Sequence, residues 1–119
     1  MAKSHKFAAV KTGSGNVLSD WLGGNTRLKA RMDVYLRRLK VMDGQWPMPY
    51  YYPLGGGIGE IRFDLMKVEH RLYGYFAQGE FIIVLASSNK KKQKQDIQTA
   101  KNLKASYQLS APATETYDV

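Results

Sequence analysis

The chain has 119 residues, with 18 Lys and Arg against 10 Asp and Glu, so its formal net charge is +8 at pH 7. It contains no cysteine, which excludes disulfides and thiolate metal sites and suits a reducing compartment. The length is enough for one domain with its own core. The excess of basic residues favours polyanionic partners, above all nucleic acid, or an acidic protein that covers the basic surface.

The chain shows no sign of a membrane segment or a targeting signal. Its longest apolar run, Phe81–Ala86, has six residues, too few to span a bilayer. The first ten residues carry charge and lack the long apolar stretch of a signal peptide. We therefore expect a cytoplasmic protein that contacts no membrane and uses no small-molecule cofactor.

The first quarter of the chain predicts a strand and a short helix. The apolar stretch Phe7–Val10 reads as a strand, and residues 12–16 have turn chemistry. Apolar residues then recur at helical spacing over Val17–Leu22, and the pair Gly23–Gly24 stops that helix.

A second, longer helix is predicted to follow, capped by Asn25 or Thr26 and ended by Gly44. One face carries an apolar stripe at helical spacing, formed by Leu28, Met32, Tyr35, Leu36, Leu39 and Met42. The other face is strongly basic. That basic face is either simply solvated or in contact with RNA or a partner.

The segment 45–57 is predicted to be an irregular loop with packed aromatic residues. It contains three prolines, the consecutive tyrosines Tyr50, Tyr51 and Tyr52, and three glycines at 55–57. The glycines are not a phosphate-binding loop, because no Gly-Lys-Ser/Thr follows and a strand comes next.

Three strands are predicted between residues 58 and 88, and parity divides their side chains between two faces. With Lys67 and Val68 as turn residues, the core face contains Ile61, Phe63, Leu65, His70, Leu72, Gly74 and Phe76. On the polar face this register sets Asp64 beside Arg71, Arg62 beside Tyr73 and Glu60 beside Tyr75.

A two-residue turn at Gln78–Gly79 leads into the third strand. That turn places Arg71 opposite Ala86 and Tyr73 opposite Val84, with Ser88 at the end of the same row. A helix is predicted after Lys94, ending near residue 107. Residues 1–107 then form a single domain, and residues 108–119 lack periodicity and are predicted to be a flexible tail.

The polar face gathers residues suited to binding and cleaving RNA. Arginine and lysine can stabilise the charge of a pentavalent phosphate without a metal, and tyrosines can stack on unpaired bases. The candidates are Arg62, Arg71, Tyr73, Tyr75, Lys90, Lys91, Lys92 and Lys94.

Each candidate also has a purely structural interpretation. Arg71 can pair with Asp64 across the hairpin, and the lysine run can be a solvated helix start. His70 falls on the core face, which favours a structural role over a catalytic one. No paired ligand spacing or Ser-His-Asp arrangement supports a metal site or a hydrolase triad.

The order of these features resembles the HigB-type, phage-derived toxins of the RelE/ParE superfamily. The resemblance covers about Val17 to Leu103. Its sharpest parts are Glu60-x-Arg62-Phe63, Arg71 with Tyr73, Tyr75 and Phe76, and Lys90-Lys91-x-Gln93-Lys94 followed by Ile97 and Ala100.

The resemblance implies an α+β fold in which an N-terminal helical pair packs on a small, curved, mainly antiparallel sheet, followed by a C-terminal helix. It implies the toxin of a toxin–antitoxin pair that cuts mRNA on the ribosome without metal, inhibited by a helix-turn-helix antitoxin. Carried onto this chain, Arg71 with Lys90 or Lys94 would stabilise the phosphate. Arg62, Tyr73, Tyr75, Lys91 and Lys92 would bind RNA.

Two other functions fit the same residues. A ParE-like gyrase inhibitor would share the fold but bind its target instead of catalysing a reaction. The Lys-Lys-x-Gln-Lys segment resembles HigB-type toxins and so favours the mRNA endonuclease over the gyrase inhibitor. A catalytically inert basic module of phage origin, binding nucleic acid or a partner protein, would need no reactive group at all.

Overall fold

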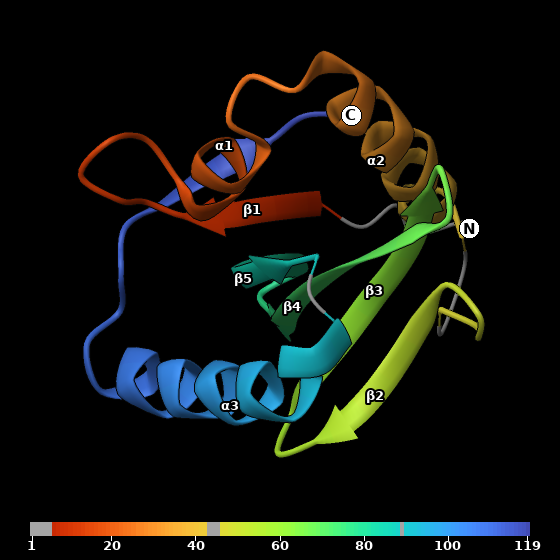
Figure 1. The fold of residues 1–119 in the computed structure, drawn as a ribbon. Helices are drawn as coiled ribbons and strands as arrows, with labels where there is room; N and C mark the ends of the chain where they lie inside the picture. The colour runs from red at the N-terminus through yellow and green to blue at the C-terminus, as the bar shows by residue number, and fades with distance from the viewer. Residues whose placement is uncertain (1–5, 43–45, 89) are drawn as a thin grey trace.

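A six-stranded sheet with helices on both faces forms the protein (Figure 1). The computed structural model describes residues 6–42, 46–88 and 90–119. The strands are β1 (Lys6–Val10), β2 (Tyr51–Gly55), β3 (Ile58–Leu65), β4 (Val68–Ala77), β5 (Glu80–Ser87) and β6 (Thr114–Tyr117). The helices are α1 (Val17–Leu22), α2 (Thr26–Lys40) and α3 (Gln93–Leu109), the last preceded by the 3-10 turn η1 (Lys90–Lys92).

The sheet is open and mostly antiparallel, in the order β2-β3-β4-β5-β1-β6. Strands β2 to β5 form an antiparallel meander, β1 lies parallel to β5, and β6 closes the far edge antiparallel to β1. The predicted α+β class with a mainly antiparallel sheet is therefore confirmed. Helices α1 and α2 cover one face as expected, whereas α3 covers the opposite face (Figure 1).

Both N-terminal helices begin where the sequence predicts, and α1 also ends there. The Asn16 side chain accepts hydrogen bonds from the free N–H groups of α1, and Gly23 ends that helix in the left-handed region with φ 56°. Asn25 caps α2, which settles the choice between Asn25 and Thr26. Helix α2 ends at Lys40; the predicted stop at Gly44 lies outside the described residues.

Two apolar cores lie on the two faces of the sheet. The larger core joins the apolar stripe of α2 to one sheet face, which carries Ile61, Phe63 and Leu72 as predicted by parity. The smaller core lies under α3, where Ala100 packs with residues that include Tyr73. The faces of β3 and β4 were thus predicted correctly, because side chains of a strand alternate with a period of two. The end of β5 was assigned to the wrong face, since Ala86 packs against the larger core and not on the side of Arg71.

The pairing partners between β3 and β4 differ from the prediction by two residues. The turn is formed by Met66 and Lys67, both with positive φ (52° and 67°), as the tightest hairpin turns require. Arg71 therefore lies opposite Arg62, and Asp64 lies opposite Glu69. A shift of two residues leaves every side chain on its predicted face.

A bulge shifts the pairing between β4 and β5. The predicted Gln78–Gly79 turn is confirmed, and the register holds as far as Gly74 opposite Ile83. Beyond the bulge Tyr73 lies opposite Leu85 and Arg71 opposite Ser87, each one residue later than predicted. Gly74 is required there, because a Cβ would collide with the carbonyl oxygen of Ile82.

Two segments predicted to be irregular are strands at the two edges of the sheet. Residues 51–55 form β2 instead of a loop, with Pro53 on the edge strand, where proline is tolerated. The segment 108–119 is not a loose tail: α3 continues to Leu109, and β6 pairs with β1. The folded unit therefore extends beyond residue 107. Among the described residues, no helix has the length and apolar character needed to cross a bilayer.

A buried hydrogen-bonded group attaches β6 to α2. The hydroxyl of Tyr117 donates to Oδ1 of Asp33 at 2.6 Å, and Nζ of Lys29 donates to Oδ2 of Asp33 at 2.9 Å. Asp33 is only 9% exposed, so its charge depends on these two donors. Burial raises the pKa of Tyr117 to about 12, which keeps the phenol protonated and able to donate.

We predict that Tyr117→Phe lowers the free energy of unfolding by about 1–3 kcal/mol, because a buried carboxylate loses a donor. Denaturant unfolding measures the change. Tyr107→Phe is the matched control, since the Tyr107 hydroxyl has no hydrogen-bond partner within the described ranges and its loss should leave stability nearly unchanged. Equal effects of the two substitutions would contradict this role for β6.

Candidate functional site

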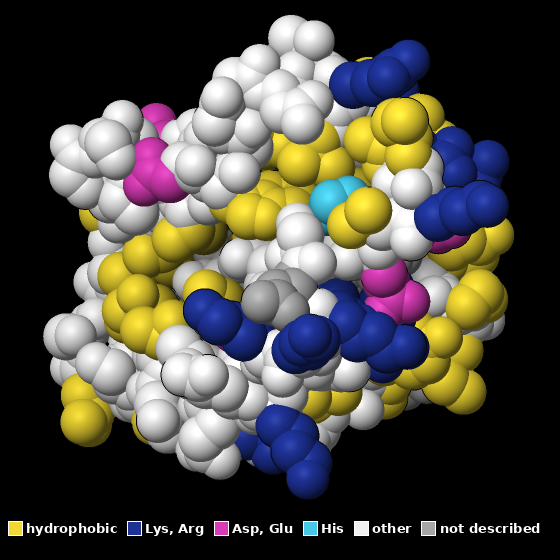
Figure 2. All heavy atoms as spheres, in the orientation of Figure 1, with side chains coloured by type: hydrophobic (Ala, Val, Ile, Leu, Met, Phe, Trp, Pro, Cys, Tyr) yellow, Lys and Arg dark blue, Asp and Glu magenta, His cyan; other side chains and the backbone are white. Residues whose placement is uncertain are grey.

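Exposed lysines surround the start of α3, where dark-blue side chains gather in Figure 2. This lysine row consists of Lys90, Lys91 and Lys92 on η1 and Lys94 in the first turn of α3, all exposed. Lys92, the residue that precedes α3, makes no side-chain capping hydrogen bond among the described residues. The positive end of the helix dipole attracts anions, as do the lysines themselves.

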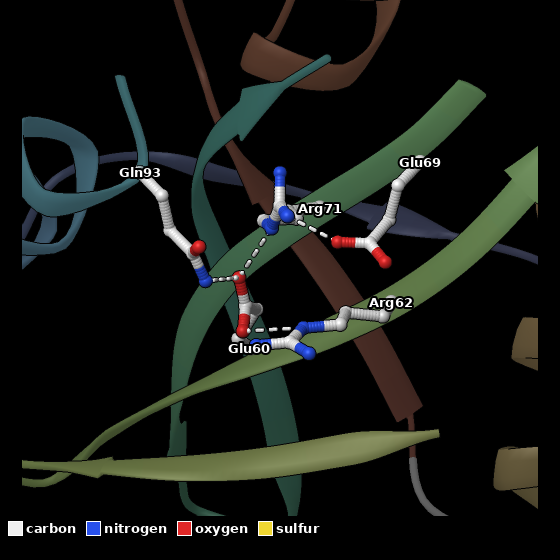
Figure 3. A network of polar contacts seen from close by, with 5 residues as sticks. All are labelled: Glu60, Arg62, Glu69, Arg71 and Gln93. Carbon is white, nitrogen blue, oxygen red and sulfur yellow. Dashed lines mark hydrogen bonds and ion pairs between the residues drawn. The ribbon is translucent and has the colours of Figure 1, made fainter. Parts of the chain in front are cut away.

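A buried carboxylate, Glu60 on β3, contacts Gln93 of α3 and so connects the helix that follows the lysine row to the sheet (Figure 3). Its Oε1 lies 3.0 Å from Nε of Arg71 and accepts from Nε2 of Gln93 at 3.2 Å. Its Oε2 accepts from Nε of Arg62 at 2.9 Å. With Glu69, which pairs with Arg71, these residues form the Glu60 network. Gln93 is the first residue of α3, so the network positions the lysine row.

Arg71 lies inside the sheet and not on a binding surface. Its side chain is fully buried and forms ion pairs with Glu60 and Glu69. The anticipated pair with Asp64 does not form, because the register sets Asp64 opposite Glu69. Nη1 of Arg71 is buried and has no hydrogen-bond partner within the described chain. In this arrangement Arg71 positions Glu60 and offers no exposed donor to a phosphate.

Tyr73 and Tyr75 are also buried, in the core under α3. Burial, reinforced by the charge of Glu60, raises the pKa of Tyr73 well above that of an exposed tyrosine. Nζ of Lys104 lies 5.8 Å from the centre of the Tyr75 ring. These two tyrosines, predicted to stack on RNA, therefore have no exposed ring face comparable to a stacking platform.

Three other tyrosines form a pocket that the strand analysis did not identify. Tyr35 of α2 and Tyr50 and Tyr52 of the β2 segment line a cavity of about 170 Å³. Pro49, Arg62, Phe63, Asp64 and Glu69 complete this tyrosine pocket. The signal in the sequence was the run of consecutive tyrosines, which was interpreted as loop packing.

Arg62 connects the tyrosine pocket to the Glu60 network. Its guanidinium carbon lies 3.8 Å from the centre of the Tyr52 ring, a close cation–π contact. The pKa of Arg62 is raised: burial opposes its charge, but Glu60, Glu69 and Tyr52 outweigh that cost. Arg62, one of the predicted RNA-binding residues, lies partly exposed at this cavity.

His70 has a structural environment, as the parity of β4 predicted. It is buried against Trp21 and Phe63, with ring centres 5.6 Å and 5.3 Å away. Its Nδ1 lies 2.7 Å from Oγ of Ser88. Ser88 thus contacts the core-face histidine instead of ending the row of Arg71, because the bulge in β5 shifts the strand end. Burial lowers the pKa of His70, although Asp64 acts in the opposite direction.

No protein-family model, curated protein or solved structure matches this chain. Over residues 6–42, 46–88 and 90–119, no group of three His, Asp or Glu side chains is placed to hold a metal ion. The structure brings together a lysine row at the start of a helix and a tyrosine pocket, joined through Glu60. Such a surface can bind a flexible polyanion with unpaired bases.

We predict that Glu60→Gln lowers the free energy of unfolding by about 3–5 kcal/mol, because Arg71 then keeps a buried charge without its main partner. Urea unfolding measures the loss. Glu80→Gln is the matched control, a partly exposed glutamate in the β4–β5 hairpin with no ion pair in the described structure. A loss as small as that of the control would show that the network does not support the fold.

The environment of His70 predicts a loss of stability on acidification. Its pKa is lower in the folded protein than the ordinary value of about 6.5, so the unfolded chain binds the extra proton more readily. The contribution is present above pH 6.5 and decreases as the pH falls through the folded pKa. The stability of the wild type should therefore decline relative to His70→Phe between about pH 7 and pH 5. A difference that does not change with pH would contradict this.

Proposed function

We propose that this protein is the toxin of a type II toxin–antitoxin pair and acts as a ribosome-dependent, metal-independent mRNA endonuclease. The observation that carries the proposal is the row of exposed lysines at the start of α3, a helix that Gln93 and Glu60 connect to Arg62. The resemblance to HigB-type toxins supports the same function. On this proposal a helix-turn-helix antitoxin is the inhibiting partner, and the site of action is the ribosome.

The proposed reaction uses the RNA's own 2′-hydroxyl as nucleophile. A base removes its proton, the oxygen attacks the adjacent phosphorus, and the 5′ oxygen of the next nucleotide leaves with a proton. The products are a 2′,3′-cyclic phosphate and a 5′-hydroxyl end. Lys90 and Lys94, both exposed, are proposed to stabilise the pentavalent phosphate, with Lys91 and Lys92 on the flanking backbone. The burial of Arg71 supports a positioning role for that residue.

A second candidate is an RNA-binding module without catalytic activity. The observation that favours it is the arrangement of Arg71, whose ion pairs with Glu60 and Glu69 occupy the arginine that a phosphate would use. The lysine row would bind RNA equally well in either case. The two candidates therefore differ in whether bound mRNA is cut.

We predict that expression of the wild type arrests bacterial growth and leaves 5′-hydroxyl cuts in translated mRNA. The variant Lys90→Ala, Lys92→Ala, Lys94→Ala should lose most of this activity, by about a hundredfold or more, because it removes preorganised phosphate donors. Mapping of 5′ ends in RNA from expressing cells measures the cuts.

The matched control removes the same charge from exposed positions away from α3, as Lys6→Ala, Lys11→Ala, Lys67→Ala. It should remain as toxic as the wild type. Equal toxicity of the two triple variants would overturn the assignment of the site. RNA binding by the wild type without any cleavage, on or off the ribosome, would select the non-catalytic candidate.

A further inference from the structure

The tyrosine pocket lies where β2 begins, at the edge of the sheet. Strand β2 pairs with residues 58–61 of β3, whereas β3 extends to Leu65. The backbone N–H of Arg62 donates to the carbonyl oxygen of Tyr50 at 3.1 Å, and Asp64 lies beyond this pairing. Nε of Arg31 donates to the carbonyl oxygen of Asp64 at 2.9 Å. The cavity of about 170 Å³ lies beside this part of β3, which β2 does not cover.

Aromatic rings give the pocket the walls of a base-binding site. The rings of Tyr35 and Tyr50 meet edge to face with centres 6.0 Å apart, and Tyr35 also packs on Phe63 at 5.7 Å. Tyr52 is held on the other side by its contact with Arg62. Flat apolar walls at fixed positions suit a planar ring, and stacking on such side chains is how proteins hold unpaired RNA bases.

The polar groups of the pocket provide a carboxylate and a guanidinium side by side. Glu69 is partly exposed, with 42% of its side chain accessible, and only one of its oxygens pairs with Arg71. The other oxygen points away from Arg71 (Figure 3). Arg62 uses Nε for Glu60, and within the described residues its two Nη groups form no hydrogen bond. One carboxylate oxygen, which has two lone pairs and can accept two hydrogen bonds, and two donor groups thus remain at the cavity.

We propose that the tyrosine pocket binds a guanine base of single-stranded RNA, with Glu69 accepting from N1–H and N2–H and Arg62 donating to O6. Guanine alone among the four bases presents two adjacent donors next to an acceptor on its Watson–Crick edge. Adenine and cytosine would place a ring-nitrogen acceptor against the carboxylate, and uracil offers it a single donor.

Charge argues against other occupants. A phosphate in the pocket would be repelled by Glu69 and by Asp64, which lies opposite Glu69 across the strands. A lysine or arginine from a partner protein would be repelled by Arg62, which already occupies the face of Tyr52. A neutral base with both donors and acceptors suits this mixed set of charges. The phosphates are left to the lysine row, which Glu60 connects to Arg62 through Gln93.

The inference rests on the proposed RNA function, and it adds a base preference to it. The test compares the binding of short oligouridines with one central substitution to wild-type protein at a fixed salt concentration. Guanosine should bind about tenfold tighter than adenosine, cytidine or uridine at that position, as a bidentate base contact provides. Inosine, which lacks the N2 amine, should lose most of the gain, whereas 7-deazaguanosine should keep it.

Two variants connect the preference to the pocket. Glu69→Gln should remove the preference for guanosine, and Glu80→Gln, a partly exposed glutamate of the β4–β5 hairpin, should keep it. Equal affinity for all four nucleotides, or full binding of inosine, would overturn the guanine site while RNA binding stands. Binding of no RNA at all would overturn the proposed function together with this inference.

Discussion

The buried carboxylate of Glu60 is the interaction on which the rest of the arrangement depends. An ionised group inside a protein is tolerated only when its charge is paired and its lone pairs are bonded. Here Arg71 of β4, Arg62 of β3 and Gln93 of α3 meet these requirements together. One side chain thus joins two strands to a helix that packs on the sheet through a small core. The hydrogen bond from Gln93 to Glu60 thus adds to the apolar contacts that hold α3 on the sheet.

This constraint separates the basic residues into two groups with different roles. Arg71 is an internal cation that balances Glu60 and Glu69. The lysines at the start of α3 are exposed. Arg62 contacts Glu60 on one side and Tyr52 on the other. The lysine row can therefore bind the charged phosphate backbone of RNA, while the tyrosine pocket can bind an unpaired, neutral base.

The sequence predicted what depends on periodicity and missed what depends on unusual turns or edges. The faces of β3 and β4 followed from alternation, but the Met66–Lys67 turn lacks the glycine or asparagine that normally marks positive φ, so the partners of Arg71 were misplaced. The bulge lies beside Gly74; a glycine inside a strand often marks a bulge, and the parity argument made no use of that signal.

The two edge strands and most of the site were not predicted, because no periodic or contiguous pattern in the sequence marks them. Strand β2 contains Pro53 between tyrosines and glycines, and β6 has the polar sequence Thr-Glu-Thr-Tyr, so neither shows an alternating apolar pattern. The lysine row was found because it is contiguous. The role of Glu60 and the tyrosine pocket were not found, because both join residues from separate elements.

The salt dependence of RNA affinity tests the central claim that Arg71 supports the site from within while the lysines bind phosphate. Each neutralised phosphate contributes about 0.7 to the slope of log affinity against log salt for a single strand. The charge-neutral pair Glu60→Gln, Arg71→Met should keep the wild-type slope in protein that remains folded. The variant Lys90→Ala, Lys92→Ala, Lys94→Ala should reduce it by about 2. A reduced slope in the first variant with an unchanged slope in the second would contradict the account.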